Sequence, residues 1–138
     1  LANSLREENH PAFIIEQLFL KAKAEGGNAV IESIRTPGEV EFLKEHADFY
    51  LFAVDADPNL RYERVQKRKT ATDRVDFNTF MAEEQREMSN DEPHMQNIAA
   101  CVRLAGNRFR NNSSIDMFYK KVRKALEKKL KISAQKVN

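Results

Sequence analysis

Short apolar runs alternate along the chain with stretches in which apolar residues recur at helical spacing. Residues 49–54 form an unbroken run, Phe-Tyr-Leu-Phe-Ala-Val, and residues 28–34 contain a second run, Ala-Val-Ile. Runs of this length that are rich in β-branched and aromatic residues predict strands, and we expect the first to be buried on both faces. Residues 107–111 predict a short edge strand, in which only Phe109 is clearly apolar.

Helical spacing and capping residues predict the helices between these strands. The expected helices cover residues 3–8, 11–25, 37–46, 58–68, 77–88, 93–105 and 113–132. Thr36-Pro37-Gly38-Glu39 is a capping box, as is the segment 113–116, and Asp57 and Asp76 are placed to cap the helices that follow them. The polar residues 69–75 predict a loop, and we expect the tail 133–138 to fray.

The alternation predicts a single α/β domain over residues 1–138, with a short parallel sheet flanked by helices. Ligands of such folds bind at the carboxyl ends of the strands. This rule places Glu32, Arg35 and Asp55 at the expected active edge, together with the start of the helix that follows Asp57.

That helix carries Arg61, Arg64 and Arg68, whose spacing puts the three guanidinium groups on one stripe. Arginine suits a phosphate group because its planar fork donates hydrogen bonds in pairs. Spacing alone also fits a solvated helix face that pairs with Glu63 and other acids, and this interpretation is the commoner one.

The composition is that of a soluble globular protein, with 41% hydrophobic and 32% charged residues and no apolar stretch long enough to span a membrane. The single cysteine, Cys101, cannot form an internal disulfide, which fits a cytoplasmic location. After Phe118, eight basic residues accompany one acid. Such a helix can bind nucleic acid, but few aromatic residues interleave with the lysines, so a solvated helix face is favoured.

Other common chemistries have no motif here. His10, His46 and His94 share no metal-ligand spacing with each other or with Cys101. The zinc-deaminase signature and the Gly-x-Ser-x-Gly nucleophile motif do not occur. These observations argue against a zinc site and against nucleophilic catalysis.

Several motifs, taken in order, resemble the nucleotide-kinase branch of P-loop proteins, in the adenylate kinase and dephospho-CoA kinase group. The resemblance extends to the kinase-like domain that is fused to some deoxycytidylate deaminases, and it covers nearly the whole chain. The residues that carry it are Asn3-Ser4-Leu5-Arg6, Val30-Ile31-Glu32-Ser33-Ile34-Arg35-Thr36-Pro37-Gly38-Glu39-Val40, Val54-Asp55-Ala56, Arg61-Tyr62-Glu63-Arg64-Val65-Gln66-Lys67-Arg68 and Asn111-Asn112-Ser113-Ser114.

The resemblance implies a role for each candidate residue. Arg6 and Arg35 would bind the phosphate of a small phosphorylated acceptor, and Glu32 would lie near the phosphates and the magnesium ion. The residues alone equally fit Glu32 as a strand-end residue that pairs with Arg35 for stability. Arg64 and Arg68 would contact the nucleotide and the transferred phosphoryl group. ATP and Mg²⁺ would be the cofactors, Glu32, Arg35 and Arg68 the catalytic residues, and residues 69–88 the lid. We expect Arg6, Arg35, Arg64 and Arg68 to converge on one anion site.

The sequence departs from the family in one respect, because no glycine is followed by Lys-Ser or Lys-Thr. The phosphate-binding loop and the strand before it are therefore absent from residues 1–138. We expect the chain by itself to be inactive, as a fragment of a kinase, and expect a homo-oligomer to close the incomplete sheet. The alternative is a non-catalytic nucleotide-sensing or interaction domain.

Overall fold

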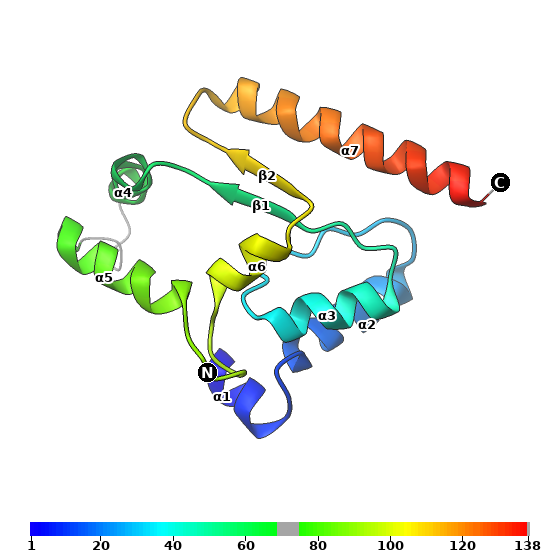
Figure 1. Ribbon diagram of the computed structural model, residues 1–138, viewed down its shortest axis with the longest axis horizontal. Helices are drawn as coiled ribbons and strands as arrows, with labels where there is room; N and C mark the ends of the chain where they lie inside the picture. Colours follow the sequence, from blue (N-terminus) through cyan, green and yellow to red (C-terminus); the bar gives the residue numbers. More distant parts are fainter. Residues whose placement is uncertain (69–74, 138) are drawn as a thin grey trace. The chain divides into compact units, whose positions relative to one another are not determined.

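The computed structural model describes residues 1–68 and 75–137, with the side chains of the last helix described as far as Lys131. The elements are α1 (Ala2–Glu8), α2 (Phe13–Glu25), α3 (Pro37–His46), β1 (Phe52–Asp55), α4 (Pro58–Lys67), α5 (Phe77–Met88), α6 (Ile98–Leu104), β2 (Asn107–Arg110) and α7 (Ile115–Val137) (Figure 1). The chain is therefore α/β, as predicted. It divides into two compact units, Leu1–Phe49 with Glu84–Leu104, and Tyr50–Glu83 with Ala105–Asn138.

The first unit is a cluster of helices in which α3 packs against α2 and α6. Ile15, Val40, Leu43 and Cys101 are almost fully buried and form its core. The start of α3 is fixed by the predicted capping box, since Thr36 Oγ1 accepts a hydrogen bond from the Glu39 amide and the Glu39 carboxylate accepts one from the Thr36 amide. Buried backbone amides at this helix start are thus satisfied within the segment.

The strand predicted at residues 28–34 does not form. These residues are irregular, Val30 is 95% exposed, and Glu32 is also exposed. A strand is stabilised by hydrogen bonds to a neighbour, and within the described residues none pairs with this segment. The prediction that Glu32 lies near the end of a strand, with Arg35 directly after it, is therefore wrong, although both lie on the segment that leads into α3.

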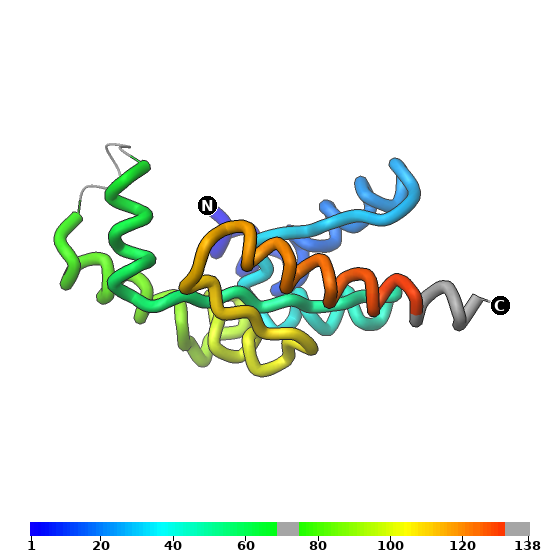
Figure 2. Tube along the Cα trace, turned by 90° about the horizontal axis from the view of Figure 1, so that it is seen from above, coloured from blue at the N-terminus to red at the C-terminus, as the bar shows by residue number. Residues whose placement is uncertain are grey.

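The second unit contains a parallel pair of strands, β1 and β2, in which Val54 is opposite Phe109 and Asp55 is opposite Arg110. The predicted edge strand is confirmed as β2. The strand predicted from the apolar run at residues 49–54 is shorter than expected, and the prediction that it is buried on both faces is wrong, because Val54 is 53% exposed. Helix α7 runs back along β2 and contacts it, as both views show (Figure 1, Figure 2).

Three helix starts differ from prediction. Helix α2 begins at Phe13, and the side chain of Asn9 donates to the Leu5 carbonyl at the end of α1 instead of capping α2. Helix α6 begins at Ile98 instead of Pro93, because residues 90–95 form turns and Asn97 Oδ1 accepts from the Ala100 amide. Helix α7 is capped by Ser114, not Ser113, and its bounds are Ile115–Val137, while the expected fraying of residues 133–138 stays a prediction.

The predicted lid, residues 69–88, is described only from Val75 onward, so residues 69–74 lie outside the described part of the chain. Tyr62 Oη and Gln66 Nε2 both donate to the Val75 carbonyl, which ties the start of this part to α4. Asp76 caps α5 as predicted, since its Oδ1 accepts from the Thr79 amide. No helix in the described residues has the length and apolar character needed to cross a membrane.

Candidate anion site

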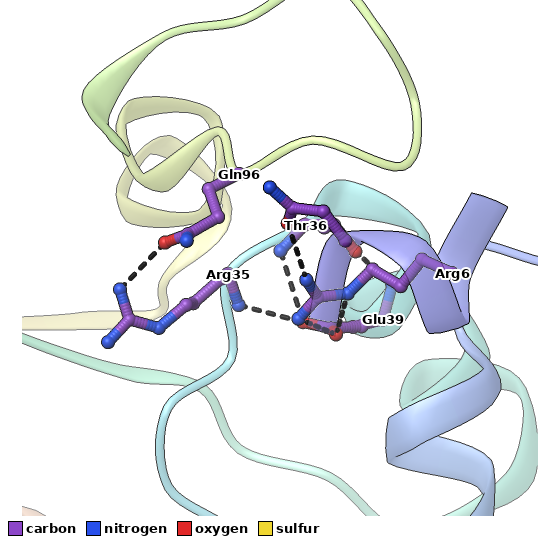
Figure 3. Close-up of polar contacts among 6 residues, drawn as sticks. Arg6, Arg35, Thr36, Glu39 and Gln96 are labelled. Carbon is purple, nitrogen blue, oxygen red and sulfur yellow. Dashed lines mark hydrogen bonds and ion pairs between the residues drawn. The ribbon is translucent and has the colours of Figure 1, made fainter. Parts of the chain in front are cut away.

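The first unit contains a buried ion pair between Arg6 and Glu39, whose side chains are 4% and 1% exposed. Arg6 Nε and Nη2 lie 2.9 and 2.8 Å from Glu39 Oε1, and Arg6 Nη1 donates to Asn3 Oδ1 (Figure 3). The donor fork of Arg6 is thus occupied by a carboxylate inside the fold. In this structure Arg6 is a structural residue, and a phosphate could reach its fork only by displacing Glu39.

The second oxygen of Glu39 holds the segment that leads into α3. Its Oε2 accepts hydrogen bonds from the backbone amides of Arg35 and Thr36, at 2.7 and 3.1 Å. One buried carboxylate therefore joins α1, through Arg6, to the backbone of the expected phosphate-binding residue Arg35.

The side chain of Arg35 is fixed at one nitrogen only. Its Nη1 donates to Glu87 Oε2 and to Gln96 Oε1, both at 2.7 Å, while the Asn97 amide donates to its carbonyl oxygen. No described residue accepts from Nε or Nη2, and the side chain is 36% exposed. These two nitrogens form the planar fork that binds a phosphate or carboxylate in bidentate fashion, so the fork of Arg35 is open.

The guanidinium groups of Arg6 and Arg35 do not meet. The Arg35 side chain extends away from Glu39 and Arg6, and only its backbone amide faces them (Figure 3). The expectation that these two arginines share one anion is therefore not met in this structure, and Arg35 is the one that is available.

Backbone strain marks the same segment. Ser33, between Glu32 and Arg35, has φ of 65°, in the left-handed region that residues other than glycine rarely adopt. Strain of this kind persists where surrounding contacts hold it, and it concentrates at functional sites. It therefore supports a functional interpretation of the segment 32–36, in which Glu32 is an exposed carboxylate.

The arginines of α4 lie in the second unit. Arg61 donates to Asp55 Oδ1 at 2.7 Å and to the Ala56 carbonyl. Arg64 is half-buried and Arg68 is exposed, and neither guanidinium donates to a described residue. Convergence of Arg64 and Arg68 with Arg35 joins residues of different units and stays a prediction.

The simpler interpretation of the arginine stripe, a solvated face paired with Glu63 and other acids, is met in part: Arg61 pairs with Asp55 and Arg68 is exposed, but Glu63 does not pair with the stripe. It forms its ion pair with Lys67, and the hydrogen bond from Lys67, together with its charge, lowers the pKa of the Glu63 carboxyl. Arg64 contributes only a minor part of that shift. The stripe therefore keeps two arginines that no described acid pairs with.

The carboxyl ends of β1 and β2 meet at a second polar edge. Asp55 and Arg110 are opposite each other, and the Asn111 amide donates to the Asp55 carbonyl at 2.7 Å. Asn112 Oδ1 accepts from the Asp57 amide at 2.8 Å, at the start of α4. The asparagines of the motif 111–114 thus tie the loop after β2 to the N-terminus of the arginine helix.

Sequence reasoning missed Glu87 and Gln96. Glu87 lies on an acidic face of α5 whose pattern predicts a solvated surface, and Gln96 lies before α6, where the sequence predicts helix. No local pattern marks either residue, because their contact with Arg35 joins positions 52 and 61 residues apart.

A cavity of about 360 Å³ also lies in the first unit. Its apolar lining comes from prolines and Met95, and its charged lining is acidic: Glu41, Asp91 and Glu92. Neither Arg35 nor Gln96 lines it. Because acidic walls repel anions, this cavity is not part of the anion site.

The described residues contain no group of three or more His, Cys, Asp or Glu side chains that could hold a metal ion by themselves. Cys101 is buried, and this burial, with a smaller contribution from the charge of Glu39, raises the pKa of its thiol to about 11. A neutral, inaccessible thiol is neither a nucleophile nor a metal ligand, so Cys101 is a core residue.

Comparison with known proteins places this chain beside proteins that carry the name UPF0200. It is 38% identical over 60 residues to a UPF0200 protein of Methanococcus maripaludis, an alignment that covers 44% of this chain and 33% of the relative. It is 29% identical over 105 residues to a UPF0200 protein of Pyrococcus horikoshii, covering 74% and 53%. It is 26% identical over 123 residues to one of Staphylothermus marinus, covering 89% and 62%.

The alignments with these three relatives thus span between 33% and 62% of the relatives' lengths. No protein-family model matches the chain, and no solved structure matches it. The name UPF0200 states no activity, so a functional proposal has to rest on the residues themselves.

Proposed function

We propose that this chain is part of a nucleotide kinase-like phosphotransferase, which transfers the γ-phosphoryl group of ATP to a small acceptor that itself carries a phosphate. The observation that carries the proposal is the open fork of Arg35, a guanidinium that is held at one nitrogen and presents the other two. Phosphoryl transfer depends on positioning and charge neutralisation, and a held arginine supplies both.

The other residues take the roles that the family resemblance implies. Arg35 binds the acceptor phosphate, and Arg64 and Arg68, which form no ion pair with a described acid, contact ATP and the transferred group. Arg6 supports this site from inside the fold, through Glu39, instead of binding phosphate directly. This assignment replaces the substrate-binding role that the resemblance alone suggests for Arg6.

A magnesium ion fits this arrangement if the phosphates supply most of its ligands. Mg²⁺ in kinases is held by substrate phosphates, several waters and only one or two carboxylates, so a site made wholly of protein ligands is not required. Glu32 is an exposed carboxylate three residues before Arg35 and would supply one such ligand. When bound, the ion would neutralise charge on the phosphates.

The fold proposed for the parent is the three-layer P-loop kinase fold, with a parallel sheet larger than β1 and β2. In that fold the strand before the phosphate-binding loop lies beside the strand that ends at Asp55. Support comes from the edge of β1 that faces away from β2, since β1 pairs only with β2 among the described residues.

The test is phosphoryl transfer by the complete gene product that contains this chain. The protein is incubated with ATP labelled in the γ-phosphate, Mg²⁺ and a panel of nucleoside monophosphates and other small phosphate esters. We expect label to appear on at least one acceptor, and expect chelation of Mg²⁺ to abolish the transfer. Tight nucleotide binding without transfer to any acceptor would contradict the proposal.

A second candidate is a non-catalytic nucleotide-sensing or interaction domain, related to the one fused to deoxycytidylate deaminases. The burial of Arg6 favours it, because one of the two expected acceptor arginines is withdrawn into an ion pair. The same experiment separates the two candidates, since this domain would bind nucleotide with no labelled product.

A further inference from the structure

Arg35 is held both through its backbone and through its side chain. Its backbone amide is bound by Glu39, its carbonyl oxygen by the Asn97 amide, and its Nη1 by two side-chain acceptors. The long flexible side chain of arginine loses much conformational freedom when it is fixed in this way. Because the same contacts leave Nε and Nη2 open, the arrangement orients a donor fork instead of consuming it.

The two acceptors on Nη1 differ in charge. Gln96 accepts through a neutral amide oxygen, which orients the guanidinium and leaves its charge intact. Glu87 accepts through a carboxylate, which partly neutralises that charge. Gln96 lies on the side of Arg35 opposite to the open fork (Figure 3), so it acts on a ligand only through Arg35.

We propose that Gln96 is a positioning residue that aims the fork of Arg35 at a phosphate group, and that Glu87 is the counter-charge with which this phosphate competes. The inference rests on the proposed function, because it takes a phosphate as the ligand of Arg35. It adds two residues that neither the sequence motifs nor the resemblance indicate.

The experiment follows the side-chain Nε–H resonance of Arg35 by nitrogen-15 NMR while the 138-residue chain is titrated with inorganic phosphate at constant, low ionic strength. The resonance is assigned by its loss in Arg35→Lys. In the unaltered chain we expect a saturable shift of this resonance.

Three variants test the separate roles. Gln96→Met keeps the side-chain volume but removes the acceptor, and we expect it to weaken phosphate binding roughly three- to tenfold, the effect of losing one orienting hydrogen bond. Gln96→Glu keeps the acceptor but adds a carboxylate, and we expect at least as large a loss. Glu87→Gln keeps the acceptor and removes the charge, and we expect binding to become about two- to fivefold tighter, as for a partly exposed ion pair.

Gln85→Met is the matched control, because Gln85 is exposed on the same helix as Glu87 and should leave binding unchanged. If Gln96→Met and Gln96→Glu both bind phosphate as the unaltered chain does, or if Glu87→Gln weakens binding, the inference is overturned while Arg35 remains an anion site. If the unaltered chain shows no saturable shift, the anion site at Arg35 and the inference fall together. Thermal unfolding of each variant shows that the compared proteins are folded, and Gln96→Glu tests the charge argument independently of Gln96→Met.

Discussion

Glu39 joins a buried ion pair to the segment that leads into α3. It is 1% exposed, and it neutralises the buried Arg6 while it accepts from two backbone amides. Removing one partner of a buried ion pair leaves the other charge uncompensated, at a cost of about 3–5 kcal/mol. We therefore expect Glu39→Gln to lower the free energy of unfolding by about that amount, as measured by urea denaturation.

The matched control is Glu41→Gln, an exposed glutamate on the same helix, which should change stability by about 0.5 kcal/mol or less. A double variant that replaces Arg6 and Glu39 together by methionine should cost less than the two single replacements added, because no buried charge remains. Additive losses would mean that the ion pair contributes nothing beyond its separate side chains.

Cys101 supplies a prediction about pH. Burial raises the pKa of its thiol to about 11, above its ordinary value, so the unfolded chain loses this proton at lower pH than the folded chain does. The contribution of the protonated Cys101 thiol to the free energy of unfolding is therefore complete below the ordinary pKa, and it is lost as the pH rises toward about 11.

The difference in unfolding free energy between the unaltered chain and Cys101→Ala should therefore shrink as the pH rises from 9.0 toward about 11. The comparison with Cys101→Ala cancels the contribution of every other titratable group, because both proteins share those groups. A difference that stays constant with pH would show that the thiol is not held neutral by burial.

At the residue scale, the sequence predicted what short-range chemistry decides. Thr36, Asp57 and Asp76 cap their helices as expected, because a cap and the amide it accepts from lie two or three residues apart. The two hydrogen bonds from Arg35 Nη1 could not be predicted, because Glu87 and Gln96 come close to Arg35 only through the packing of the first unit. The same packing buries Arg6 in an ion pair with Glu39, whereas the motif alone predicts that Arg6 binds a phosphate.

Helix α7 gives a prediction at the scale of an element. Two serines, Ser113 and Ser114, precede this helix. The Oγ atom of Ser114 accepts a hydrogen bond from the Met117 amide, so Ser114 is the cap. Loss of a serine cap costs about 1 kcal/mol. We expect Ser114→Ala to lower stability by about that amount and Ser113→Ala to have almost no effect, measured by thermal unfolding. The reverse ranking would place the helix start one residue earlier.

At the scale of elements, the strand predicted at residues 28–34 shows where pattern fails. The apolar run is real, but a strand exists only where a neighbour offers a ladder, and the described residues offer none. Helices α3, α4 and α5 were predicted well because their hydrogen bonds close within the element and their caps are local. Helix α6 was predicted too long because the turns of residues 90–95 use side-chain hydrogen bonds that periodicity does not reveal.

At the scale of the whole molecule, β1 has one edge that no described strand covers, and large apolar side chains on α7 are exposed, among them Ile115 and Tyr119. An uncovered strand edge is a template for pairing with another chain. We expect the 138-residue chain to self-associate in sedimentation at micromolar concentration. A compact monomer that unfolds cooperatively would contradict this expectation.

The proposed binding of the acceptor phosphate by Arg35 can be measured as kcat/KM of the complete gene product. We compare Arg35→Ala with Arg86→Ala, an exposed arginine in the last turn of α5, and measure thermal unfolding alongside. Arg35→Ala should lower kcat/KM for the acceptor by about a hundredfold or more, while it lowers stability by only about 1 kcal/mol. Arg86→Ala should change neither. A loss of activity in Arg35→Ala no larger than that in Arg86→Ala would contradict the account.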